Sequence, residues 1–208
     1  MSLAVLVPVL GRPHRVSPTL DGFDGFHVLF IADPNDHEEI AALRDAGADF
    51  ITHAGGYAEK IQRGVQATNE DLIFTAADDL DPSPDWFAKA NAHIGNGCEV
   101  VGVNDLCSQR VQAGIHATHF LMTRSYAEWP TIDGQPGPFF QGYSHWYVDD
   151  EFVGTAQKRG AIKFALDSHV QHLHPMIGKA PDDETYRKGR ADRKRDKALF
   201  NRRRHLWT

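Results

Sequence analysis

Short apolar segments alternate with amphipathic segments through the first half of the chain. We predict strands where a run of Val, Leu, Ile or Phe is bounded by turn-forming residues, and helices where apolar residues recur every three or four positions. The predicted strands are residues 3–10, 26–32, 50–51 and 72–75, and the predicted helices are residues 37–46 and 57–67. Strands and helices alternating at this spacing indicate βαβ units and a mostly parallel sheet, whose ligands lie outside the carboxyl ends of the strands.

The second half of the sequence is less regular. Helices are predicted over residues 86–94 and 148–159, and strands over residues 99–103, 114–123 and 161–165. Residues 129–143 contain three prolines and three glycines, a composition typical of a long surface loop over a pocket. We therefore expect an α/β fold with one central sheet.

The composition supports one folded catalytic-size domain. The chain has 208 residues, of which 41% are hydrophobic, enough for one sizeable core. It holds only two cysteines, Cys98 and Cys107, no apolar run approaches about 18 residues, and no charged-then-apolar leader with a cleavage site is recognisable. We therefore expect a cytoplasmic protein in a reducing environment, with no membrane as a partner.

Charge is divided unevenly between the body of the chain and its C-terminal part. Residues 1–180 carry 12 Lys and Arg against 23 Asp and Glu, whereas residues 181–208 carry 10 against 5. We therefore divide the chain into a domain of catalytic size, residues 1–178, and a basic helical extension, residues 179–208. The extension could contact nucleic acid, an acidic partner or the acidic body of its own domain. Alternatively it is a solvated helix docked by Leu199, Phe200, Leu206 and Trp207.

Three carboxylates are clustered just after the strand predicted over residues 72–75. Asp78, Asp79 and Asp81 repel one another unless solvent, protonation or a cation relieves the repulsion. Mg²⁺ and Mn²⁺ suit carboxylate oxygens, and Mg²⁺ is commonly held by a few protein carboxylates together with substrate phosphates. The cluster therefore indicates a site for a metal ion and a nucleoside diphosphate. The alternative is a polar turn, because Asp and Pro favour loops.

Several segments between residues 3 and 175 resemble the nucleotide-sugar glycosyltransferases of the glycosyltransferase-A fold. The resemblance is to the large inverting family 2, and more closely to its short bacteriophage-encoded members. The segments are VPVLGRP from Val7, IAD ending at Asp33, the predicted helix from Gly56 to Ala67, DDLD from Asp78, PDWF from Pro84, VDDEF from Val148 and HLHP from His172. Their common order along the chain carries the resemblance.

The resemblance implies a single glycosyltransferase-A-like, Rossmann-like domain with a mostly parallel sheet, and it assigns roles to individual residues. The expected cofactor is Mn²⁺ or Mg²⁺, with Asp79 as the first candidate ligand and with Asp81 and His172 beside it. The nucleotide-sugar donor is expected at Pro8, Arg12, Asp33, Lys60 and Asp78. From its own chemistry, Lys60 could reach a diphosphate or be solvated.

The acceptor hydroxyl of such a reaction must lose its proton, so a general base is needed. The segment from Val148 resembles the family's E-D-x-D/E-L helix start but has valine at the first acidic position. The resemblance therefore assigns the base to Asp149, with Asp150 as a neighbour that could substitute. The alternative is an ordinary acidic first turn, which the helix dipole favours by about 0.3–1 kcal/mol.

Aromatic and histidine side chains near this segment are interpreted from their chemistry. On the acceptor side, Tyr143 and Trp146 could stack on a sugar or base or pack beneath the loop, and Glu151 could orient the acceptor or the loop. His116 and His119 would face opposite sides of a strand, so we expect structural roles for them. No CxxC or HExxH spacing supports a zinc site.

The function implied by the resemblance is transfer of a sugar from a nucleotide-sugar to an acceptor hydroxyl, with inversion. The phage-like resemblance implies a modified DNA base or a virion protein as acceptor, and the host cytoplasm as location. Two alternatives stay open. A nucleotidyltransferase has a related architecture but needs a glycine-rich phosphate loop, and only Gly11 follows the first predicted strand. A non-catalytic nucleic-acid-binding protein would use the basic extension and bind with a steep salt dependence.

Overall fold

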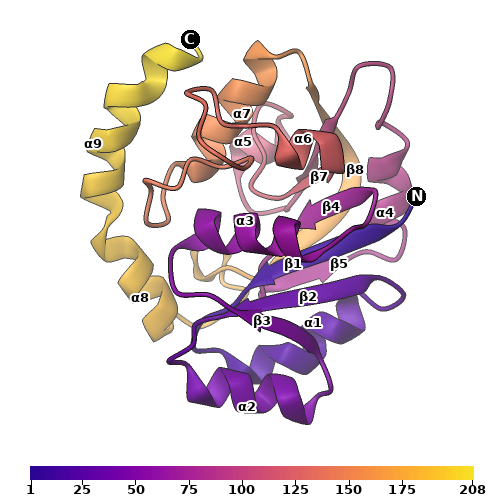
Figure 1. Cartoon of the computed structure of the whole chain (residues 1–208), viewed down its shortest axis with the longest axis vertical. Coiled ribbons are helices and arrows are strands. Elements are labelled where there is room, and N and C mark those ends of the chain that lie inside the picture. Colours follow the sequence, from indigo (N-terminus) through magenta and orange to yellow (C-terminus); the bar gives the residue numbers. More distant parts are fainter.

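A mixed sheet of eight strands runs through the computed structural model, which describes residues 1–208 (Figure 1). The strands are β1 (Leu3–Pro8), β2 (His27–Ala32), β3 (Asp49–Thr52), β4 (Leu72–Thr75), β5 (Leu80–Pro82), β6 (Val100–Asn104), β7 (Phe120–Thr123) and β8 (Ile162–His172). Their order across the sheet is β3-β2-β1-β4-β7-β6-β8-β5.

The first four strands form a parallel half-sheet. β1 pairs in parallel with β2 and β4, and β2 pairs in parallel with β3. Alternate residues of β1 face opposite sides: Val5 and Val7 belong to one buried apolar cluster, and Ala4 and Leu6 to the other. The βαβ pattern predicted for the first half of the chain is therefore confirmed, and all four β1 residues are fully buried.

Helices cover both faces of the sheet. They are η1 (Pro13–Arg15), α1 (Val16–Gly22), α2 (His37–Asp45), α3 (Tyr57–Ala67), α4 (Trp86–Asn91), α5 (Gln109–Gln112), α6 (Arg124–Glu128), α7 (Val148–Lys158), η2 (Pro175–Ile177), α8 (Glu184–Ala191), α9 (Arg193–Arg203) and η3 (Arg204–Leu206). α1, α2 and α4 pack on one face, and α3, α6 and α7 on the other. α8 and α9 follow one flank of the molecule (Figure 1). None of these helices has the length and apolar character needed to cross a bilayer.

The second half of the sheet corrects the sequence prediction in two places. Only Phe120–Thr123 of the strand predicted over residues 114–123 joins the sheet, antiparallel to β4 and β6, and residues 114–119 are irregular. The strand predicted over residues 161–165 continues to His172, because its second half pairs with β5. β5 itself lies where the sequence indicated a turn.

Candidate active site

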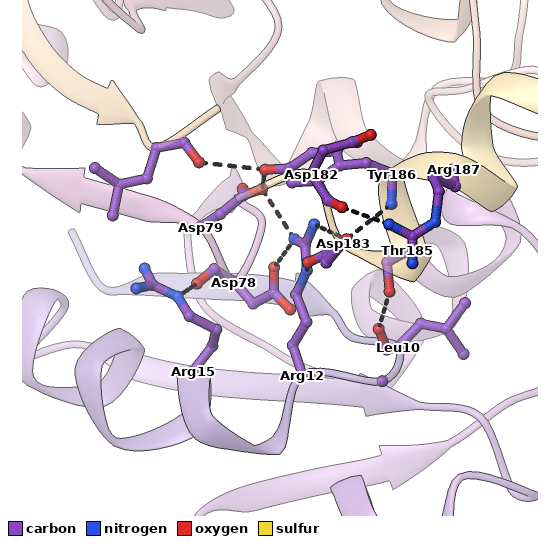
Figure 2. A network of polar contacts seen from close by, with 12 residues as sticks. Leu10, Arg12, Arg15, Asp78, Asp79, Asp182, Asp183, Thr185, Tyr186 and Arg187 are labelled. Carbon is purple, nitrogen blue, oxygen red and sulfur yellow. Dashed lines mark hydrogen bonds and ion pairs between the residues drawn. The ribbon is translucent and has the colours of Figure 1, made fainter. Parts of the chain in front are cut away.

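Two buried carboxylates lie directly after β4, at the carboxyl ends of the parallel strands. Asp78 and Asp79 are 5% and 6% exposed. The guanidinium of Arg12, from the loop after β1, bridges them: its Nη1 lies 2.8 Å from Oδ1 of Asp78 and 3.0 Å from Oδ2 of Asp79 (Figure 2). The fold thus brings together three side chains that the sequence places 66 and 67 positions apart.

Backbone hydrogen bonds fix the position of this acidic pair. The carbonyl oxygen of Asp78 accepts from Nε of Arg15 at 2.8 Å and from the hydroxyl of Thr19 at 3.2 Å. The carbonyl oxygen of Asp79 accepts from the amide of Leu173 at 2.8 Å. The turn that carries both carboxylates is therefore held between η1 and α1 on one side and the end of β8 on the other.

The two carboxyl groups differ in their tendency to ionise. Burial, followed by the charge of Asp79, raises the pKa of Asp78 to about 7. Burial acts in the same direction on Asp79, but the imidazole of His172 and the hydroxyl of Tyr186 outweigh it, and the pKa of Asp79 is lowered. Burial alone would lower the pKa of His172, but the nearby Asp79 outweighs this effect and raises it. Asp79 is therefore the member of the pair that stays ionised and suits a cation.

One oxygen of Asp79 is suited to coordinate a metal ion. Oδ1 is buried and accepts no hydrogen bond of regular geometry, and Nε2 of His172 lies 3.3 Å from it, at ion-pair distance. A carboxylate oxygen and an imidazole nitrogen that converge in this way fit Mn²⁺ as a donor pair, with further positions for phosphate and water. Asp81, in contrast, lies on β5 with an exposed side chain and makes no side-chain hydrogen bond or ion pair.

The C-terminal extension covers the acidic pair (Figure 2). The hydroxyl of Tyr186, on α8, donates to Oδ2 of Asp79 at 2.5 Å. Asp183, just before α8, accepts from Nε of Arg12 at 2.8 Å, and the Arg12 guanidinium lies 4.2 Å from the centre of the Tyr186 ring. Sequence reasoning missed Asp183 and Tyr186, because 107 positions separate Tyr186 from Asp79 and only the basic character of the extension is visible in the sequence.

A surface cleft of about 320 Å³ opens between the ends of β1 and β2 and the start of α8. Its lining residues are Leu10, Gly11, Asp33, Asn35, Asp36, Glu184, Thr185 and Lys188. Asp33 and Pro8 thus stand at the two strand ends where a nucleotide is expected, and their role in binding stays a prediction.

Lys60 is 4% exposed and donates from Nζ to the carbonyl oxygen of Val9 at 2.8 Å, so here it holds the chain after β1 and is not solvated.

A second group of ionisable side chains lies at the start of α7. Nε2 of His116 lies 3.1 Å from Oδ2 of Asp149, and Asp150 forms an ion pair with Arg110 at 2.9 Å. The side chain of Asp149 is 25% exposed, whereas that of His116 is 5% exposed. Asp149 can therefore be reached from solvent, while Asp150 is engaged by a counter-ion.

His116 belongs to this group, although the sequence suggested a structural role for it. The irregular segment that carries it is held by Thr118, whose hydroxyl donates to the buried Asp105 at 2.8 Å. Nδ1 of His116 is buried without a hydrogen-bond partner, so the ring makes its polar contact with Asp149 through Nε2 alone. Burial alone would raise the pKa of Asp149, but the contact with His116 outweighs it and lowers the pKa.

The same irregular segment connects the two ionisable groups. His119 contacts the carbonyl oxygen of Thr75 through Nδ1 at 3.2 Å, and its ring lies 5.4 Å from that of His172. Three residues of extended chain span at most about 10 Å. His116, at Asp149, and His119, at His172, therefore attach to the chain within about 10 Å of each other.

The predicted acceptor-side residues contact the C-terminal extension. Glu151 is 3% exposed and accepts from the hydroxyl of Tyr143 at 2.8 Å and from Nη2 of Arg203 at 2.7 Å. The indole Nε1 of Trp146 donates to the carbonyl oxygen of Gly189 at 2.7 Å. In this structure the three side chains pack beneath the extension, and their contact with an acceptor stays a prediction.

The fold is shared with structurally characterised glycosyltransferases. Glucosyl-3-phosphoglycerate synthase from Mycobacterium tuberculosis, in complex with Mn²⁺, uridine diphosphate and glucosyl-3-phosphoglycerate, superposes with a TM-score of 0.59 at 16% identity, covering 91% of this chain and 77% of that one. The same enzyme with Mg²⁺ and uridine diphosphate gives 0.54 at 15% identity, with the same coverage of both chains. A further mycobacterial protein gives 0.57 at 15% identity, covering 82% of this chain and 65% of that one.

These similarities establish the class of fold. No protein-family model and no curated protein matches the sequence. At 15–16% identity the structural likeness concerns the fold alone, which is the α/β fold of the glycosyltransferase-A type predicted from the sequence. The chemistry of this chain must therefore be argued from its own side chains.

Proposed function

We propose that the protein is a metal-dependent glycosyltransferase that moves a sugar from a nucleotide-sugar to an acceptor hydroxyl. The observation that carries the proposal is the buried Oδ1 of Asp79 with Nε2 of His172 converging on it at 3.3 Å, at the carboxyl ends of a glycosyltransferase-A sheet. The structural neighbours support this choice, since glucosyl-3-phosphoglycerate synthase is described with Mn²⁺ or Mg²⁺ and with uridine diphosphate or uridine-diphosphate-glucose.

Asp79 and His172 would hold the Mn²⁺ or Mg²⁺ ion, with Asp78 behind them. When bound, such an ion stabilises the negative charge that develops on the departing diphosphate. Arg12 already lies 3.0 Å from Asp79 and provides a second positive charge at the same place. Its planar guanidinium suits phosphate oxygens as well as carboxylates. Asp33, in the cleft at the end of β2, is the candidate contact for the nucleoside.

Asp149 is the candidate general base. In the reaction, the acceptor oxygen forms a bond to the anomeric carbon of the donor sugar, and the bond from that carbon to the diphosphate breaks with its electron pair on the departing oxygen. The acceptor proton passes to the carboxylate of Asp149. Attack opposite the leaving group inverts the configuration. His116 holds the carboxylate in place, and Asp150 ranks second because Arg110 engages it.

The acceptor stays a prediction. Glucosyl-3-phosphoglycerate synthase is described in complex with phosphoglyceric acid. That ligand belongs to that enzyme and is not assigned to this chain. A modified DNA base or a virion protein is implied for this chain by the resemblance to phage enzymes. The exposed basic residues of α9, such as Lys194 and Lys197, are compatible with a polyanionic acceptor but do not select it.

The proposal is tested by incubating the protein with UDP-, GDP- and TDP-sugars and Mn²⁺ and measuring the nucleotide products. We expect slow, Mn²⁺-dependent release of one nucleoside diphosphate, because water can replace an absent acceptor. The release should be lost in Asp79→Ala and kept in the matched control Asp81→Ala, whose side chain is exposed. Release of pyrophosphate would indicate nucleotidyl transfer instead, and no release from any donor would contradict the proposal.

A further inference from the structure

The two helices of the C-terminal extension dock in different ways. α9 is anchored in the body of the protein: Asp196 is fully buried and accepts from the amides of Ser144, His145 and Trp146 at 3.0–3.2 Å. The ring of Phe200 stacks on that of Tyr147 at 5.0 Å. α9 therefore has the buried hydrogen bonds and aromatic packing of a permanent structural element.

α8 is held mainly by polar contacts. None of its residues is buried. The segment made of Asp183 and the first turns of α8 contacts the site through Asp183 on Arg12, Tyr186 on Asp79, and Thr185, whose hydroxyl donates to the carbonyl oxygen of Leu10 at 3.0 Å. Segments with little buried apolar surface open at low free-energy cost. α8 therefore opens more readily than α9.

The contacts of α8 involve the residue proposed to bind the metal. Oδ2 of Asp79 accepts from both the Tyr186 hydroxyl and Nη1 of Arg12, and the second hydrogen-bonding arm of Arg12 is held by Asp183. A divalent cation on Asp79 would be repelled by a guanidinium 3.0 Å from the same carboxylate. The cation would also compete with Tyr186 for the electron pairs of that carboxylate. The closed arrangement of α8 and a loaded metal site are therefore mutually unfavourable.

We propose that residues 182–188 form a latch that competes with the divalent cation for Asp79 and opens when the cation binds. This inference rests on the proposed function, which makes Asp79 a metal ligand. The pivot is at Asp192, which ends α8 and begins α9 and makes no side-chain capping hydrogen bond to α9. The latch keeps the acidic pair neutralised by Arg12 until metal and donor arrive.

The first test measures Mn²⁺ affinity by calorimetry, with the full-length chain and Mn²⁺ alone. Tyr186→Phe removes the hydroxyl that competes for Asp79, so its Kd for Mn²⁺ should fall by about three- to tenfold, as expected for one net hydrogen bond. The matched control is Tyr126→Phe, a buried tyrosine on α6 whose hydroxyl has no hydrogen-bond partner, and its Kd should equal that of the wild type. An unchanged or weaker affinity in Tyr186→Phe would overturn the latch.

The second test needs no variant. Hydrogen exchange of the wild-type amides of residues 184–191 should accelerate when Mn²⁺ saturates the site, while that of residues 193–203 stays constant. Equal exchange of α8 with and without saturating Mn²⁺ would also overturn the latch. The proposed function and the latch fail in different ways. If the wild type binds no Mn²⁺ through Asp79, the proposed function fails. If Mn²⁺ binds through Asp79 and α8 is not released, only the latch is refuted.

Discussion

Nε2 of His116 lies 3.1 Å from Oδ2 of Asp149, although 33 positions separate the two residues in the sequence. The contact joins a buried imidazole to a carboxylate at the first turn of α7 that solvent can reach. It gives the carboxylate of Asp149 a fixed orientation at the first turn of α7. Two predictions follow from this pair.

Replacing Asp149 by asparagine should separate binding from turnover. Asp149→Asn keeps the shape of the side chain and the contact with His116 but cannot accept the acceptor proton. We expect Mn²⁺-dependent nucleotide binding near that of the wild type, with sugar transfer reduced by about 10²- to 10⁴-fold, the usual contribution of a general base. Binding is measured by calorimetry and transfer by product formation. Unimpaired transfer would remove Asp149 from the role of base.

Replacing His116 by glutamine should change the pH dependence of transfer. His116 lowers the pKa of Asp149 below 3.8, the ordinary value of an Asp carboxyl, so this carboxylate, the proposed base, stays ionised to lower pH in the wild type. Without His116 the pKa of Asp149 rises, because burial then dominates. The acid limb of the kcat profile should therefore lie at higher pH in His116→Gln. The control is His205→Gln, at an exposed histidine of η3, whose pH profile should match that of the wild type. Superposable profiles for His116→Gln and the wild type would exclude an effect of His116 on the pKa of Asp149.

The ion pair between Arg203 and Glu151 should contribute to stability. Both side chains are buried, at 12% and 4% exposure, and Arg203 also lies over the ring of Phe140. Arg203→Ala leaves a buried carboxylate without its counter-ion, which should lower the free energy of unfolding by about 3 kcal/mol. Arg190→Gln breaks an exposed pair with Asp182 and should leave the free energy of unfolding close to that of the wild type. Urea unfolding measures both, and equal losses would contradict the assigned burial.

Gly102 should tolerate no side chain. A Cβ at this position of β6 would lie 2.5 Å from the Cβ of Ala117 and 2.9 Å from Cδ1 of Phe164. Ala117 is the neighbour of His116 in the irregular segment, so the clash also disturbs the site. Gly102→Ala should lower the free energy of unfolding by about 1–3 kcal/mol through overpacking. A stability within about 0.5 kcal/mol of the wild type would show that the segment can move aside.

The regular half of the fold could be predicted from the sequence, because its apolar periodicity reports burial directly. The predicted helix over residues 57–67 and strand over residues 72–75 match α3 and β4 to the residue. Two other elements lack that signal. Pro18 and Gly22 obscure the helical pattern of α1, and β5 is a short strand that pairs only with the far end of β8.

The candidate-site residues could be predicted most directly where they follow a strand or begin a helix. Asp79 and Asp149 satisfy that condition, since they follow β4 and begin α7. His116, Asp183 and Tyr186 come from an irregular segment and from the extension, and long-range packing alone brings them to the carboxylates. The sequence also left the partners of Glu151 and Lys60 open. In the structure Glu151 accepts from Arg203, and Lys60 donates to the carbonyl oxygen of Val9.

The most direct test is a crystal structure of the protein with Mn²⁺ and uridine diphosphate, with the metal located by its anomalous scattering. The account predicts one strong peak within about 2.0–2.3 Å of Oδ1 of Asp79 and Nε2 of His172, with the Tyr186 hydroxyl displaced. A peak at His116, Asp149 and Asp150, whose ligand atoms lie within 4.8 Å of one another, would contradict the account. Metal and nucleotide bound at Asp79 with the Tyr186 hydroxyl still on its carboxylate would contradict the latch alone.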